Sequence, residues 1–149
     1  MAQDPAGTDG APVALAVLYR AAQYGAERSA AGEARELAET FVKELAGLLS
    51  VPLRDRFVYD VALVVTELLT NASTFAPGPC LLELEGRPAG VTVAVSDTST
   101  ALPRAYPHDP TRIGRHGLEI IHRICADVRI ERVPVGKRIS ATLRLPTIL

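Results

Sequence analysis

Apolar residues recur at helical spacing in two long segments, and each segment predicts a helix. The first begins after Ser29, a residue type that favours the N-cap position, and ends at residues 50–52. The second covers residues 53–75, where the sequence P-G-P at 77–79 stops it. Its middle is apolar nearly all round, so we expect it to pack on more than one face. The apolar stripe expected on the first helix consists of Leu37, Phe41, Leu45, Leu48 and Leu49.

Alternation of apolar and polar residues predicts strands elsewhere in the chain. The predicted strands cover residues 13–23, 81–85, 91–97, 128–133 and 139–145. A turn at 86–90 makes a hairpin of the second and third, and residues 134–136 join the last two. A third helix is expected over 114–125. The order of elements predicts the α+β class, with three main helices layered on a mixed, mainly antiparallel sheet.

Two segments have no such periodicity. Residues 98–113 contain three prolines, and an irregular segment of this length within a compact domain is typical of a lid or a binding loop. Residues 1–10 are rich in Gly, Ala, Asp and Pro, and we interpret them as a disordered tail. The chain has 149 residues, so residues 11–149 fit a single domain.

Composition and charge exclude several classes of protein. Hydrophobic residues make up 48% and charged residues 22%, which is typical of a globular chain rather than a disordered one. Sixteen basic and seventeen acidic residues give a net charge of -1, and this balance argues against a general nucleic-acid binder. The N-terminus lacks the basic start of a secretion signal, so we expect a cytoplasmic protein. Cys80 and Cys125 have no zinc-ligand spacing and are interpreted as idle thiols in a reducing compartment.

The most apolar helix carries two side chains that suit chemistry. Glu67 and Asn71 stand at i and i+4, so they share one face of the helix. A carboxylate and an amide there need hydrogen bonds, a metal ion or a cavity, because burying them without partners costs about 2 kcal/mol or more. The alternative is a solvated polar stripe that also includes Asp60 and Thr74.

Two further positions are candidates for ligand binding. Asp97 ends a valine-rich strand, where its carboxylate can accept hydrogen bonds from a ligand such as the amine of an adenine, or can cap the local turn. The sequence G-R-H-G-L at 114–118 lies where a loop meets a helix, and glycines there let backbone amides approach an anion. A plain helix start is the alternative, because neither a Walker A nor a Rossmann pattern is present. The three histidines have no metal-ligand spacing with one another or with either cysteine.

The order of four motifs resembles the GHKL ATPase superfamily. They read E-L-L-T-N at 67–71, V-S-D-T-S at 95–99, G-R-H-G-L-E at 114–119 and G-K-R-I at 136–139. The resemblance is closest to the single-domain, histidine-kinase-like ATP-binding proteins of bacteria, which include the anti-sigma-factor serine kinases. It covers roughly residues 25–145, and E-L-x-T-N-A is its most specific motif. It implies a Bergerat-type two-layer α/β sandwich that binds ATP and Mg²⁺ beneath a mobile lid.

The resemblance also implies roles for individual residues. Asn71 would coordinate Mg²⁺, Glu67 would act as the catalytic base, and Asp97 would accept a hydrogen bond from the adenine amine. The lid segment would cover the phosphates. The lid residues implied to contact the nucleotide are Gly114, Arg115, His116, Gly117 and Leu118.

Two motifs depart from the family pattern. The adenine motif usually reads D-x-G-x-G, but Ser99 and Ala101 stand at the glycine positions here, and a Cβ there restricts the backbone beside the nucleotide. The last motif often carries a threonine near the adenine, whereas Lys137 follows Gly136 in this chain. We still count Ser99, Ala101 and Lys137 among the nucleotide-binding positions.

By resemblance, the leading hypothesis is a serine/threonine protein kinase that phosphorylates an anti-sigma-factor antagonist and sequesters a sigma factor. The partners implied are that sigma factor, the antagonist and a second copy of the chain. The alternative is a weak or inactive ATP-binding module that works as a protein–protein switch, which the two lost glycines favour. A metabolic ATPase or a stand-alone histidine kinase fits less well, because the chain has no room for a dimerisation helix pair or a transducer domain.

Overall fold

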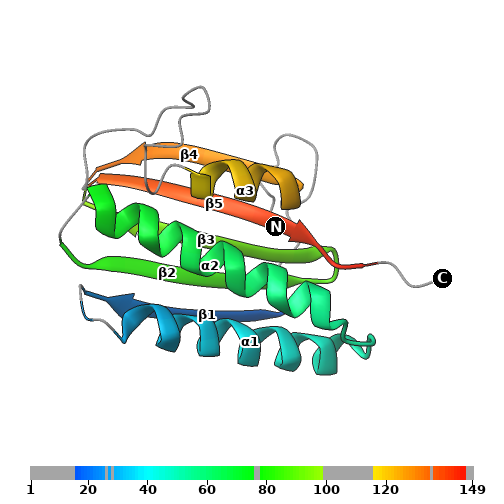
Figure 1. The fold of residues 1–149 in the computed structure, drawn as a ribbon. Helices are drawn as coiled ribbons and strands as arrows, with labels where there is room; N and C mark the ends of the chain where they lie inside the picture. The colour runs from blue at the N-terminus through cyan, green and yellow to red at the C-terminus, as the bar shows by residue number, and fades with distance from the viewer. Residues whose placement is uncertain are drawn as a thin grey trace, which may run out of the picture.

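Helices cover one face of a sheet in the computed structural model, which describes residues 16–25, 27, 29–75, 78–98, 116–134 and 136–146 (Figure 1). The helices of this part of the chain are α1 (Ala30–Leu49), α2 (Asp55–Phe75) and α3 (His116–Ile124). The strands are β1 (Leu18–Tyr24), β2 (Cys80–Arg87), β3 (Gly90–Asp97), β4 (Asp127–Val133) and β5 (Gly136–Arg144). Every predicted element with described residues is therefore present. The tail at 1–10 and most of the loop at 98–113 lie outside the described residues.

The five strands form one sheet in the order β1-β2-β3-β5-β4. All four ladders are antiparallel, so the sheet agrees with the predicted α+β class and its mainly antiparallel pairing. Strand β5 lies between β3 and β4, which brings the end of the first hairpin against the turn of the second, where β5 begins. In this register Asp97, the last residue of β3, stands opposite Lys137 of β5.

Helix α1 forms where the sequence predicts it, but two details differ. Ser29 occupies the N-cap position with φ -76° and ψ -9°, and its side chain makes no capping hydrogen bond because this backbone is already helical rather than extended. Ser50 ends the helix in the left-handed region, with φ 54°. Leu48 was expected in the apolar stripe, yet 61% of it is exposed. Leu49, in the same turn, packs against the core, so Leu48 lies at the outer edge of the apolar stripe.

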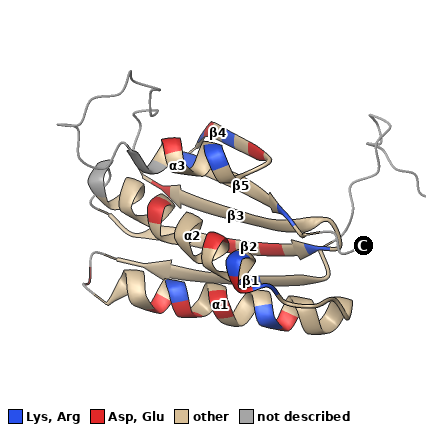
Figure 2. Ribbon diagram, turned by 45° about the vertical axis from the view of Figure 1, so that its right-hand side comes forward, with Lys and Arg blue, Asp and Glu red and all other residues tan. Residues whose placement is uncertain are grey.

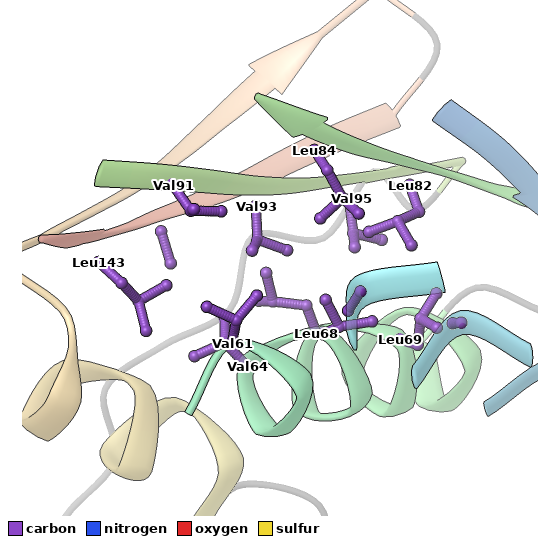
Figure 3. Packing of buried hydrophobic residues seen from close by; sticks show 14 of the residues in the cluster. Val61, Val64, Leu68, Leu69, Leu82, Leu84, Val91, Val93, Val95 and Leu143 are labelled. Carbon is purple, nitrogen blue, oxygen red and sulfur yellow. The ribbon is translucent and has the colours of Figure 1, made fainter. Parts of the chain in front are cut away.

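Helix α2 packs on three sides, as its apolar sequence predicts. It contacts α1, α3 and the inner face of β2, β3 and β5. Figure 3 shows Val61 and Val64 near Val91 and Leu143, whereas Leu68 and Leu69 lie toward Val95 and Leu82. The residues of this core that are no more than 2% exposed include Phe41, Val42, Leu45, Val61, Val64, Val65, Leu68, Leu82, Leu84, Val91, Val93, Ile121, Ala141 and Leu143.

The β2–β3 turn is tighter than the sequence predicts, since both strands extend into the segment 86–90 and leave only residues 88 and 89 between them. At the start of β3, Gly90 permits the close approach of β5, because a Cβ at Gly90 would overlap the carbonyl oxygen of Leu143. Strand β1 begins at Leu18, whereas the sequence predicts a start at residue 13. Residues 13–15 lie outside the described residues, and residues 16 and 17 precede the strand.

The sheet face opposite the helices is polar. Glu83 accepts a hydrogen bond from the Tyr19 hydroxyl at 2.7 Å and lies 3.5 Å from the guanidinium of Arg138, which also reaches Glu131 at 3.7 Å. These contacts join β1, β2, β5 and β4 across one face. Figure 2 shows that acidic and basic residues are interspersed on α1 and β4. None of the described helices is both long and apolar enough to span a bilayer.

Candidate functional site

The candidate site lies at the end of the sheet where β2 begins and β3 finishes. Tyr24 pairs with Cys80, and Lys137 pairs with both Asp97 and Arg132. Cys80 is next to Asp97 across the β2–β3 ladder, since Leu81 pairs with Ser96. Neighbouring residues in such a row point to the same face of a sheet. Asp97, Lys137 and Cys80 are all buried, so this row forms one end of the inner, helix-covered face.

The direction of α2 brings Glu67 and Asn71 toward this row. Figure 3 shows that Val61 and Val64 lie toward Val91, while Leu68 lies toward Val95. The helix therefore advances in the direction in which β3 approaches Asp97. Residue 71 follows Leu68 by almost one turn, and only four residues separate the end of α2 from Cys80. Asn71 and Asp97 thus lie at the same end of the fold.

Asn71 has the clearest ligand-binding chemistry in the described part of the chain. Only 4% of the residue is exposed, and its Oδ1 atom has no hydrogen-bond partner there. A buried amide oxygen without a partner is costly unless a ligand satisfies it. This rules out the solvated-stripe interpretation for Asn71 and leaves an uncharged hard oxygen available to a ligand.

An amide oxygen of this kind suits Mg²⁺. Mg²⁺ prefers oxygen ligands and commonly takes one or two from the protein, with the rest from water and substrate phosphates. The described residues contain no cluster of three His, Cys, Asp or Glu side chains that could hold a metal unaided. Asn71, with the Glu67 carboxylate one turn away, therefore fits Mg²⁺ held together with a phosphate ligand.

Glu67 differs from Asn71 in its surroundings. Glu67 is only partly buried, and it lies on the same face of α2 as Asn71. A carboxylate that is partly open to solvent can be reached by an incoming hydroxyl and can pass its proton on to water. The pair therefore offers a metal ligand and a proton acceptor one helical turn apart.

Asp97 and Lys137 form a buried ion pair. The Lys137 ammonium donates a hydrogen bond to Asp97 Oδ2 at 2.6 Å, and the side chains of Lys137 and Asp97 are 1% and 2% exposed. Gly136 makes this contact possible, because a Cβ at that position would overlap the Asp97 carbonyl oxygen. Asp97 was predicted to bind a ligand or to cap its turn, and its carboxylate accepts a hydrogen bond from the Lys137 cation of β5.

The sequence reasoning counted Lys137 as a nucleotide-binding position but missed its pairing with Asp97. Only the β3–β5 ladder brings the two residues together, and they are forty positions apart in the chain. The signal that was available is a pair of oppositely charged residues, one at the end of a valine-rich strand and one at the start of another predicted strand region. A charge in such a place needs a partner if it is buried.

The lid residues are described only in part. Ser99, Ala101, Gly114 and Arg115 lie outside the described residues, so their predicted contacts stay predictions. His116 and Gly117 are the first residues of α3, which packs against α2. Leu118 is half-buried and packs against the core. The structure assigns Leu118 a packing contact, and nothing described places it on a ligand.

Both cysteines are free thiols, as the sequence predicts. Burial, and to a smaller extent the carboxylates of Asp97 and Glu27, raise the pKa of the Cys80 thiol. Burial, followed by the Asp60 carboxylate, raises the pKa of Cys125 from 9.0 to about 12. A thiol reacts as its thiolate, so the raised pKa lowers the reactive fraction of both cysteines at neutral pH in the folded protein.

A labelling experiment tests this pKa shift. In a Cys80→Ala variant, the remaining Cys125 thiol should react with a disulfide reagent at pH 8 about a thousandfold more slowly than in urea, because three pKa units separate the two thiolate populations. As pH rises, the labelling rate of the unfolded chain should level off near pH 9 while that of the folded chain keeps rising toward pH 12. A folded chain whose labelling rate levels off near pH 9 would contradict the shift.

Comparisons with known proteins agree with this arrangement. The family described as the histidine kinase-like ATPase domain matches residues 20–143. That range begins in β1 and ends in β5, so it includes Glu67, Asn71, Asp97 and Lys137. No curated protein matches the chain significantly.

Proposed function

Because the chain belongs to the histidine kinase-like ATPase family, and its domain is an ATP-binding one, we propose that it is an ATP- and Mg²⁺-dependent serine/threonine protein kinase. Its substrate would be a serine or threonine of an anti-sigma-factor antagonist, as the resemblance to anti-sigma-factor kinases implies. The observation that carries the proposal is the buried, unpartnered Oδ1 of Asn71, one helical turn from Glu67. That pairing provides for both the metal and the proton in a phosphoryl transfer.

The residues divide the reaction between them. The substrate hydroxyl attacks the γ-phosphorus of ATP, the bond from that phosphorus to the bridging oxygen breaks, and ADP leaves. Glu67 accepts the proton that the hydroxyl loses. Asn71 would hold Mg²⁺, which neutralises charge on the phosphates when bound. Asp97 would fix the base of the nucleotide at the sheet end, and the amides at the start of α3 would lie over the phosphates.

The proposal predicts a selective loss of phosphoryl transfer in a Glu67→Gln variant. The amide has nearly the shape of the carboxylate but accepts no proton, so transfer from labelled ATP to the antagonist protein should fall about a hundredfold or more. The affinity for ATP should change little, because Glu67 acts on the attacking hydroxyl. Transfer is measured by label incorporation and affinity by calorimetry.

Glu36→Gln is the matched control, since it makes the same change at an exposed position on α1. It should transfer phosphate at the rate of the unmodified chain. If Glu67→Gln and Glu36→Gln transfer equally, Glu67 is not the base. If the unmodified chain and Glu67→Gln both transfer no more phosphate than a blank while ATP binds, the kinase proposal fails.

A second function, a non-catalytic switch module, is favoured by the Asp97–Lys137 ion pair. The Asp97 carboxylate, which the resemblance assigns to the adenine amine, already accepts a hydrogen bond from Lys137 at 2.6 Å. A nucleotide base must therefore share or displace that contact, which weakens binding. Calorimetry separates the two functions: a chain that binds no Mg-ATP leaves only the switch.

The partners proposed are those that the resemblance implies: a sigma factor, its antagonist and a second copy of the chain. A self-contact through the α1 stripe is restricted by the fold, because Phe41 and Leu45 are buried in the core. A contact through this helix would use Leu48, which is 61% exposed in its last turn.

A further inference from the structure

We propose that the groove between α1 and α2 is a contact surface for a second copy of the chain, with Arg35 of each copy facing Glu39 of the other. The inference deepens the proposed self-contact by naming its surface and the charges that hold it. It rests on the proposed function for the second copy as a partner, and it requires neither ATP binding nor phosphoryl transfer.

The groove lies between two helices that run side by side in the helix layer (Figure 1). Its volume is about 190 Å³, several times the space of about 30 Å³ that a water molecule takes, so it can accept a side chain from a partner. None of its lining residues belongs to the candidate site. The residues that line it are Arg35 and Glu39 of α1 and Tyr59, Ala62, Leu63 and Thr66 of α2.

Arg35 and Glu39 bring two opposite charges to this groove. They stand at i and i+4, yet they form no ion pair with each other, and neither side chain has a hydrogen-bond or ionic partner within the described residues. Arg56 and Asp60, which have the same spacing on α2, do pair at 3.1 Å. The groove therefore holds a cation and an anion that no described side chain neutralises.

Two opposite charges one turn apart form a self-complementary surface. The two positions are separated by about 6 Å along the helix. A two-fold axis that is perpendicular to α1 and passes midway between them places each residue of one copy opposite the other residue of the second copy. An acidic or a basic partner would be attracted by one of these charges and repelled by the other. Charge complementarity therefore favours a second copy as the occupant.

The apolar part of the groove suits such a contact. Tyr59 is 60% exposed, and Leu63 beside it is half-buried. Tyrosine and arginine are enriched at the centres of protein interfaces. The apolar stripe expected on α1 offers less, because Leu48 is its exposed member. On the opposite face of the sheet, Glu83 and Arg138 lie 3.5 Å apart, so these charges already have partners within the chain.

The test is an exchange of charges, read by analytical ultracentrifugation. The unmodified chain should dimerise with a dissociation constant on the order of 10 µM, as is common for small interfaces, so samples cover about 1–500 µM. Arg35→Glu and Glu39→Arg each place like charges opposite one another at both ends of the contact. Either change alone should therefore weaken the dimer about tenfold or more.

An equal mixture of the two variants should dimerise like the unmodified chain, because each acidic copy then faces a basic one. A chain that carries both changes should do the same. Recovery in the mixture can arise only between chains, so it separates a contact from a change within one helix. Should Glu39→Arg not fold, Glu39→Lys replaces it.

Arg129→Glu is the matched control, since it reverses an exposed charge on β4 that is paired only with its neighbour Asp127. It should dimerise like the unmodified chain. The inference is overturned if the unmodified chain stays monomeric over this concentration range, if the mixture does not recover, or if Arg129→Glu weakens the dimer as much as Arg35→Glu does. A monomeric chain that binds Mg-ATP in calorimetry keeps the proposed function, whereas a chain that dimerises in this way and binds no nucleotide keeps only this inference.

Discussion

Replacing Lys137 with Met should lower the free energy of unfolding by about 3–5 kcal/mol, the usual cost of removing one partner of a buried ion pair. The methionine keeps most of the volume of the lysine, so the loss comes from electrostatics rather than from a cavity. Asp97 is left as a buried carboxylate without its cation, since its side chain is only 2% exposed. Urea unfolding, followed by circular dichroism, measures the change.

A double-mutant cycle identifies the cause of this loss. Asp97→Asn/Lys137→Met removes both charges, so it should be more stable than Lys137→Met alone and recover much of the lost free energy. Arg56→Met is the matched control, because Arg56 pairs with Asp60 while its side chain is 79% exposed. An exposed pair contributes at most about 1 kcal/mol. If Lys137→Met costs no more than Arg56→Met, the pair does not stabilise the fold as its burial implies.

Local patterns in the sequence were sufficient to predict the helices and strands. The length of α2 follows from its continuous apolar sequence and from the prolines that end it, and these signals lie within a few residues of the positions they determine. The position of Leu48 could not be read in this way. Its spacing is helical, but its exposure depends on how far the packed core extends around α1, which is a property of the assembled fold.

The same distinction between local and long-range contacts applies to the candidate site. Glu67 and Asn71 could be predicted to share a face, because one helix fixes their geometry. The Asp97–Lys137 pair could not, since its formation requires β5 to insert between β3 and β4. Turn signals predict that two consecutive strands pair as a hairpin. They do not predict the pairing of strands from different hairpins. The partner of the Asp97 carboxylate is thus set by sheet order.

Replacing Asn71 with Leu should separate stability from ligand binding. The leucine has a similar volume and removes a buried oxygen that has no hydrogen-bond partner in the described structure. We therefore expect the ligand-free protein to be as stable as the unmodified chain or about 1 kcal/mol more stable, because the desolvation of that oxygen no longer opposes folding. Chemical unfolding without nucleotide measures this change.

The same variant should lose its stabilisation by Mg-ATP. A ligand at one hundred times its dissociation constant stabilises the native state by about 2.7 kcal/mol, and Mg²⁺ chelation should remove the metal-dependent part of that gain in the unmodified chain. Asn71→Leu should be stabilised by ATP only as much as the unmodified chain is after chelation. Adding the chelator should then change nothing, since the leucine side chain offers no oxygen to the metal. Ser73→Ala, a change at an exposed position on α2, is the control and should respond to Mg-ATP like the unmodified chain. A full Mg²⁺-dependent shift in Asn71→Leu would show that the metal binds elsewhere. A large loss of stability in the ligand-free variant would show instead that the Asn71 amide is needed to hold the fold together.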